Sequence, residues 1–258
     1  VNDRFTSIPF YYYCRNGALI GSFAYNDLWL ILQQMEVLEV LNESFFEMLW
    51  LRRLLGTKTL DKHSSFLPAA HYLVYDGNTV LLNPYWCPDY TKDYSRSVKD
   101  HSIILAEAIK RSIVRKTSDH KKYGLFLSGG MDSRTILSAF DSPPCCFTAT
   151  YNKTNNREYE VTRELARIKG AKHIHLQIPP DHFSNIMNNA VKLSGGMYEA
   201  NSIFMGFKDV VASEVDVAFH GHGFDYMFQG MYVPSKNYQI FSRTLKFRRL
   251  APLDIDLV

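Results

Sequence analysis

The sequence lacks the features that would assign it to a membrane, an oxidising compartment or nucleic acid. No apolar run approaches the ~18 residues of a membrane span, and no signal-peptide pattern opens the chain. The 4 cysteines show no metal-ligand spacing, and the adjacent Cys145 and Cys146 are poorly placed for a disulfide. A formal net charge of +3 is too small to argue for nucleic acid. We therefore expect a cytoplasmic protein without a nucleic-acid or membrane partner.

The composition that remains is that of an ordinary globular protein. The chain has 258 residues, of which 46% are hydrophobic and 21% charged, enough for one large or two modest domains. We expect two, at residues 1–95 and 96–258, because a polar stretch with Pro84 and Pro88 at its start separates two different patterns. The first domain has a predicted hairpin around Asn16-Gly17, a predicted helix at residues 44–55 that ends at Gly56, and a second strand pair.

Residues 96–258 alternate between helix and strand patterns. The predicted helices cover residues 98–116, 134–140, 157–169 and 181–193. The predicted strands cover residues 123–127, 145–150, 173–178 and 215–219. This alternation predicts an α/β fold, a parallel sheet with helices on both faces. Ligands of such sheets bind beyond the carboxyl ends of the strands, so we expect the site in the loops that follow them.

The loop after the strand at residues 123–127 carries the strongest functional signal. It reads Ser128-Gly129-Gly130-Met131-Asp132-Ser133 and leads directly into a helix. The paired glycines permit a sharp turn, and amides at a helix N-terminus favour an anion such as phosphate. The serine hydroxyls add donors, and Asp132 is placed to hold a metal that neutralises phosphate charge. The Walker lysine is absent, so the loop predicts a nucleotide site of another kind.

A second glycine-rich loop follows the predicted strand at residues 215–219. It reads HGHGFDYMFQG from His220 and includes Gly221, His222 and Asp225. Alone, it is a weak signal, because Gly-His-Gly is also typical of a tight turn and Asp225 of a helix cap. Two such loops at one sheet edge could face one nucleotide.

Together the two motifs resemble those of the asparagine synthetase family, S-G-G-L-D-S followed by S-G-E-G-x-D-E-x-F-x-G-Y. Three further segments are similar to the family: "LPAAHYLVYDGN", "FYYYCRNGALIGSFAYNDLWLIL" and the stretch from Glu158 to His175. The resemblance implies an adenine nucleotide alpha hydrolase-like PP-loop domain at 96–258. It also implies that 1–95 is the end of a glutaminase-like α+β domain of the Ntn type.

In that family ATP adenylates a carboxylate, pyrophosphate leaves, and an amine or ammonia attacks the acyl group. The resemblance implies a pyrophosphate-binding set at Ser128, Gly129, Gly130 and Ser133. It implies Mg²⁺ ligands at Asp132 and Asp225, and an adenosine site lined by Leu127, Ala149 and Gly221.

The sequence departs from the family pattern in four places. His222 replaces the glutamate associated with deprotonating the attacking amine, and a histidine can serve as that base. Arg134 replaces a small hydroxyl residue after the loop, and "GGMYEANSIF" lacks the Glu-Pro of the aspartate-recognition segment. Cys14 lies inside a predicted strand and does not replace the N-terminal nucleophile of the glutaminase. We therefore expect no glutamine hydrolysis from this chain, which begins at Val1 and which we expect to be partial.

Several alternatives stay open at this stage. One is a ligase of the same family for another acid and amine, including lactam or macrolactam closure. Another is a nucleotide-binding partner protein that has lost catalysis. A tRNA-modifying enzyme shares the first loop, but the weak charge, the missing catalytic Cys-x-x-Cys and the second motif disfavour it. The sequence does not give the acid, the amine or the oligomeric state, a homodimer included.

Overall fold

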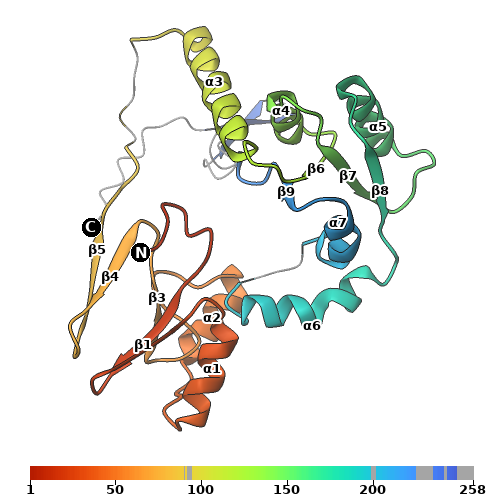
Figure 1. Cartoon of the computed structure of the whole chain (residues 1–258). Helices are drawn as coiled ribbons and strands as arrows, with labels where there is room; N and C mark the ends of the chain where they lie inside the picture. The colour runs from red at the N-terminus through yellow and green to blue at the C-terminus, as the bar shows by residue number, and fades with distance from the viewer. Residues whose placement is uncertain (90, 92–94, 199–201, 225–234, 241–242, 249–258) are drawn as a thin grey trace. The chain divides into compact units, whose positions relative to one another are not determined.

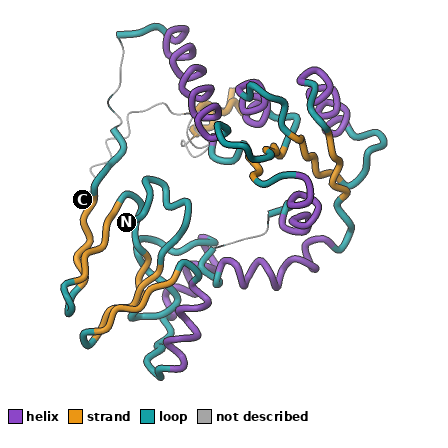
Figure 2. The backbone as a smooth tube through the Cα atoms, viewed as in Figure 1, coloured by secondary structure: helices purple, strands orange, loops and turns teal. Residues whose placement is uncertain are grey.

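The computed structural model describes residues 1–89, 91, 95–198, 202–224, 235–240 and 243–248. These residues form two compact units (Figures 1 and 2). The first contains residues 1–96 and 178–208, and the second contains residues 97–177 and 209–258. Within the described part of the chain, no helix combines the length and the apolar content that a membrane crossing requires.

The first unit is built on a three-stranded antiparallel sheet of order β2-β1-β3. The strands of this sheet are β1 (Tyr11–Arg15), β2 (Ala18–Ser22) and β3 (Ser64–Phe66). A separate antiparallel pair consists of β4 (His71–Tyr75) and β5 (Val80–Pro84). The helices of this unit are α1 (Tyr25–Gln34), α2 (Asn42–Leu51), α6 (His182–Ser194) and the short 3₁₀ helix η1 (Met205–Phe207). Asn16 and Gly17 both have positive φ, 51° and 70°, which fits the twist of a tight hairpin. The predicted β1–β2 hairpin and β4–β5 pair are confirmed.

Two features of the first unit differ from the sequence-based expectation. Helix α1 was not predicted, because the run "LWLIL" is apolar on every side and hides the helical period. Its buried residues, Tyr25, Leu28 and Leu32, follow the three- to four-residue spacing of a helix face. Helix α2 ends earlier than expected, at Arg52 in the left-handed conformation (φ 57°), and not at Gly56. Burial of one face therefore accounts for α1, whereas nothing in the structure explains the early end of α2.

The second unit contains a four-stranded parallel sheet of order β8-β7-β6-β9, flanked by helices. Its strands are β6 (Tyr123–Phe126), β7 (Cys145–Thr150), β8 (His173–Gln177) and β9 (Val217–Phe219), with a separate antiparallel hairpin of β10 (Ser235–Ile240) and β11 (Arg243–Arg248). Its helices are α3 (Val98–Lys116), α4 (Met131–Ala139), α5 (Arg157–Lys169) and most of α7 (Lys208–Glu214). The α/β class and the parallel sheet are confirmed, whereas the β10–β11 hairpin was not predicted.

The strand order reverses at the β6–β9 pair. From β6 the chain moves outward to β7 and β8, and it then returns to place β9 on the free side of β6. In open parallel sheets the crevice at such a switch point, beyond the carboxyl ends of the strands, is where ligands bind. The loops that follow β6 and β9 both begin at this point.

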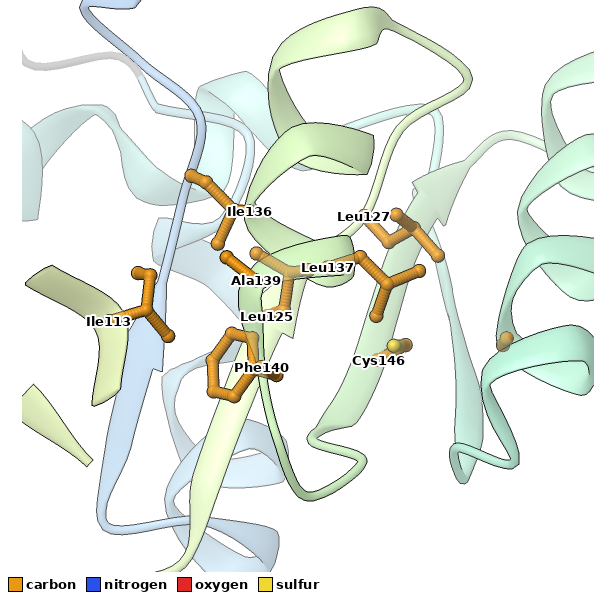
Figure 3. Packing of buried hydrophobic residues seen from close by; sticks show 9 residues of the cluster. Ile113, Leu125, Leu127, Ile136, Leu137, Ala139, Phe140 and Cys146 are labelled. Carbon is orange, nitrogen blue, oxygen red and sulfur yellow. The ribbon is translucent and has the colours of Figure 1, made fainter. Parts of the chain in front are cut away.

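The core beneath this edge fixes the position of α4. Leu125 of β6 and Leu127 just after it pack with Ile136 and Leu137 of α4 and with Ile113 of α3 (Figure 3). Leu125 is completely buried. Burying side chains of this size stabilises the fold by about 1.5–3 kcal/mol each. The start of α4 is thereby held directly above the end of β6.

A polar ladder joins β7 to β8 on the face that α5 contacts. Thr148 Oγ1 lies 2.9 Å from His173 Nε2, and Thr150 Oγ1 lies 2.7 Å from His175 Nε2. The Tyr159 ring of α5 contacts both imidazoles. Burial lowers the pKa of His173, and the neighbouring His175 and nearby cations lower it further. Burial and Lys153 lower the pKa of His175.

We expect this ladder to make the protein less stable in mild acid. Because both pKa values are lower in the folded protein than in the unfolded chain, the unfolded chain binds more protons between those lowered values and about 6.5. Stability is therefore lost as the pH falls below about 6.5. Urea unfolding at pH 7.5 and at pH 5.5 measures the loss, and the double variant H173Q/H175Q should reduce it. His120→Gln, at an exposed histidine, should leave it unchanged. An equal loss in wild type and double variant would contradict this origin.

Candidate nucleotide site

The loop between β6 and α4 is closed by its two serines. The Ser133 hydroxyl donates to the Ser128 carbonyl at 3.0 Å and accepts the Ser128 amide at 3.0 Å. The two hydroxyl oxygens lie 3.0 Å apart, and Ser128 Oγ accepts the Gly130 amide at 3.2 Å. Ser133 is buried, with 3% of its surface exposed. The hydroxyls thus hold the loop's shape, and a phosphate contact through them requires an exchange of these bonds.

The first turn of α4 is the part of this loop region that suits an anion. The Gly129 amide donates to Glu158 Oε1 at 3.1 Å, and the Gly130 amide is bonded to Ser128. The first amides of a helix have no intrahelical partner. Gly130 is the N-cap of α4 and has no side chain to accept them. The helix dipole adds partial positive charge at this end, so the first turn of α4 can receive an anion.

The loop after β9 touches this first turn directly. A Cβ atom at Gly221 would lie 2.9 Å from the Ser133 amide nitrogen and 3.0 Å from Asp132 Cβ. Real Cβ contacts do not occur at the first distance, so any side chain at Gly221 would push the two loops apart. The structure therefore brings together the two motifs that the sequence pattern had assigned to one site.

Two histidines flank Gly221. The His222 amide donates to Nδ1 of His220 at 3.2 Å, so this nitrogen carries no proton and the neutral ring is protonated on Nε2. Burial and the neighbouring His222 lower the pKa of His220. The His222 side chain is exposed beside the loop. Asp225, the second predicted metal ligand, lies outside the described residues.

The remaining predicted residues occupy the same edge of the sheet. Leu127 is bonded to β7 through its amide, which donates to the Phe147 carbonyl at 2.8 Å, and through its carbonyl, which accepts Thr148 Oγ1 at 2.9 Å. Its side chain is buried in the core. Ala149 is half-buried at the end of β7. Arg134 donates from Nε to the Gly130 carbonyl at 3.1 Å and so also contacts the loop.

The described residues could bind Mg²⁺ only together with the phosphates of a bound nucleotide. The described residues contain no group of three or more histidine, cysteine, aspartate or glutamate side chains that could hold a metal. Mg²⁺ is commonly bound by one or two carboxylates together with the phosphates of the substrate. Asp132 is half-buried in the first turn of α4, where such a carboxylate would stand.

A cavity of about 690 Å³ lies at the other end of the sheet. Its lining includes Tyr123, Cys145 and Val215, at the amino ends of β6, β7 and β9. Neither glycine-rich loop contributes to it. This cavity therefore does not mark the switch-point site.

These features define the second unit as an α/β domain with a candidate anion-binding site at the switch point of a parallel sheet. The family model of asparagine synthase matches residues 105–253, more than half of the chain, and the chain belongs to this family of ATP-dependent amide-forming ligases. No curated protein matches it.

Sequence reasoning assigned no role to two residues that contact the site. Glu158 is the first residue of a segment that resembles the family. It is an acidic residue in the first turn of the helix after β7, at the same edge of the sheet, and this position could have indicated its role. His220 was quoted only as part of the second motif. Its bond to the His222 amide depends on the turn geometry, which the letters do not show.

The contact between the loops predicts unequal effects of two glycine substitutions. Gly221→Ala should destabilise the fold by about 1–3 kcal/mol, because the added methyl meets backbone atoms of α4. Gly129→Ala is the matched control, since a Cβ there would meet its nearest neighbours at an ordinary 3.7 Å. It should change stability by less than ~0.5 kcal/mol. Urea unfolding of both variants checks this, and equal stabilities would show that the loops are not in contact in solution.

Proposed function

We propose that the chain adenylates a carboxylate with ATP, releases pyrophosphate and transfers the acyl group to an amine or ammonia. The observation that supports this most is the contact of Gly221 with the first turn of α4 at the switch point. It joins both family motifs into one site, in a chain that belongs to the asparagine synthase family. The substrates would be a small-molecule or peptide carboxylate and an amine, and the reaction would take place in the cytoplasm.

The domain assignment belongs to the same proposal. Residues 96–258 would be a PP-loop domain of the adenine nucleotide alpha hydrolase type, and residues 1–95 the end of a glutaminase-like domain. Cys14 supports the view that this chain does not hydrolyse glutamine. It lies within β1, paired with Leu19 of β2, and not at a free chain end, where an Ntn-type nucleophile must be.

In the proposed complex the phosphates lie against the first turn of α4, next to Ser128 and Ser133. Asp132 and Asp225 would hold Mg²⁺, which supplies neutralisation of the phosphate charge. The backbone at Leu127, Ala149 and Gly221 would line the adenosine. Amides fixed before the reaction stabilise the charge of the leaving pyrophosphate without reorganising.

The reaction proceeds by two displacements. An oxygen of the substrate carboxylate attacks the α-phosphorus of ATP, and the bond to pyrophosphate breaks. The amine nitrogen then attacks the acyl carbon, and AMP leaves. His222 would accept the proton that the attacking nitrogen loses, as its exposed position beside the loop permits.

Closure of a lactam or macrolactam ring is a second candidate. It is favoured by His222 in place of the family's glutamate and by the absence of Glu-Pro from "GGMYEANSIF". The first difference concerns the attacking amine and the second the recognition of the carboxylate substrate, and neither changes the residues of the loop at 128–133.

The products of ATP cleavage test the proposed reaction. With a panel of carboxylic acids and Mg²⁺, we expect AMP and pyrophosphate, separated by anion-exchange chromatography. Asp132→Asn should lower the rate at least ~10-fold, because a charge-assisted ligand is lost. ADP and phosphate as products would contradict the proposal. Binding of ATP without turnover of any acid would favour a catalytically inactive partner protein.

The two half-reactions should separate at His222. In His222→Ala, amide formation should fall by ~10²–10⁴-fold, the usual contribution of a general base, while pyrophosphate–ATP exchange survives. If both half-reactions fall together in His222→Ala, the residue holds the loop and is not the base.

A further inference from the structure

Glu158 contacts the nucleotide loop from the side of α5. Its Oε1 accepts the Gly129 amide at 3.1 Å. Among the residues that the structure describes, no lysine or arginine forms an ion pair with this carboxylate, and the Gly129 amide is the one donor that it accepts. Glu158 is exposed, and its carboxylate could be solvated by water alone. Its hydrogen bond to the loop amide is therefore a specific contact between α5 and the loop.

The start of α5 does not need Glu158. Asn156 is the N-cap, and its side chain accepts the Tyr159 amide at 3.1 Å. A second acidic residue, Glu160, also lies in the first turn, where negative charge is favourable. The hydrogen bond of Glu158 is therefore directed at the loop and does not serve to cap its own helix.

The loop at residues 128–133 and the start of α4 are contacted on two opposite sides. On the side of β7 and β8, a Cβ at Gly129 would lie 3.7 Å from Glu158 Oε2 and 3.7 Å from Val161 Cγ1, both of α5. On the side of β9, Gly221 abuts the start of α4. Since β9 and β7 flank β6 on opposite sides, these contacts confine the loop between them.

The bond to Glu158 also determines which amides face a ligand. The Gly129 amide is directed at α5 and the Gly130 amide at Ser128, so neither is presented to the switch-point crevice. The loop then continues into the first turn of α4, whose N-cap is Gly130. Without Glu158, the Gly129 amide would lose its acceptor, and a glycine pair has little conformational preference of its own to keep the turn.

We propose that Glu158 is a positioning residue of the phosphate-binding loop, which it braces by accepting the Gly129 amide. This inference rests on the proposed function, because it concerns how the same loop presents donors to the phosphates of ATP. The brace requires an acceptor oxygen and not a charge. A glutamine can therefore replace Glu158, whereas an alanine cannot.

Three variants separate this role from the others that a carboxylate could have: Glu158→Ala, Glu158→Gln and the matched control Glu160→Ala. In the ligand-free protein, exchange of the Gly129 amide proton should be at least ~10-fold faster in Glu158→Ala, the scale of one lost hydrogen bond. Glu158→Gln and Glu160→Ala should exchange like the wild type. Calorimetry with ATP·Mg²⁺ should show a Kd ~5–10-fold weaker in Glu158→Ala and within twofold in the other two.

Other outcomes would overturn the proposal. Tighter ATP binding in both Glu158 variants would show a carboxylate that competes with phosphate, and equal weakening in both would show a metal ligand or another charge-dependent role. If Glu158→Ala does not fold, an affinity of Glu158→Gln outside the twofold range still decides against the brace. If the wild type does not bind ATP·Mg²⁺, the proposed function fails, while the exchange of the Gly129 amide still tests the brace by itself.

Discussion

The approach of Gly221 to the first turn of α4 is the contact on which the candidate site depends. It links the loop after β9 to the loop after β6, and it exists because position 221 has no side chain. The parallel pairing of β6 with β9 brings the two loops to the same edge. The buried contacts of Leu125 and Ile136 then set the height of α4 above that edge. A methyl group at Gly221 would meet backbone atoms that neither the sheet nor the core leaves free to move.

The electrostatics of the site follow from how the loop satisfies its own polar groups. Ser128 and Ser133 bond to each other, Gly130 bonds to Ser128, and Gly129 bonds to Glu158. The start of α4, where the helix dipole favours negative charge, follows directly after these bonded groups. A loop that closes on itself in this way is already shaped before a ligand arrives, and pre-formed donors are more effective than donors that must reorient.

The acceptor side of the proposed reaction differs from the family pattern at one residue of the same loop. His222 follows the glycine that makes the close contact, and its amide is held by His220 Nδ1. The turn that contacts α4 and the turn that presents the proposed base are therefore one structure.

The sequence by itself determined the α/β class and the bounds of the strongest elements, including α3, β7 and α5, because their hydrophobic periods and caps are local properties. It also predicted a phosphate-binding loop at residues 128–133, since the glycine pair, hydroxyls and carboxylate are adjacent in the chain. The tertiary structure decided what depends on distant segments. Helix α1 appears only because the core buries one face of an evenly apolar run, and α2 stops at Arg52 without a glycine. Strand order set which loop meets the first motif, and packing alone revealed that Gly221 touches α4 and that Glu158 accepts the Gly129 amide. No local sequence pattern predicts contacts between segments so far apart in the chain, because these contacts arise from strand pairing and side-chain burial that form together.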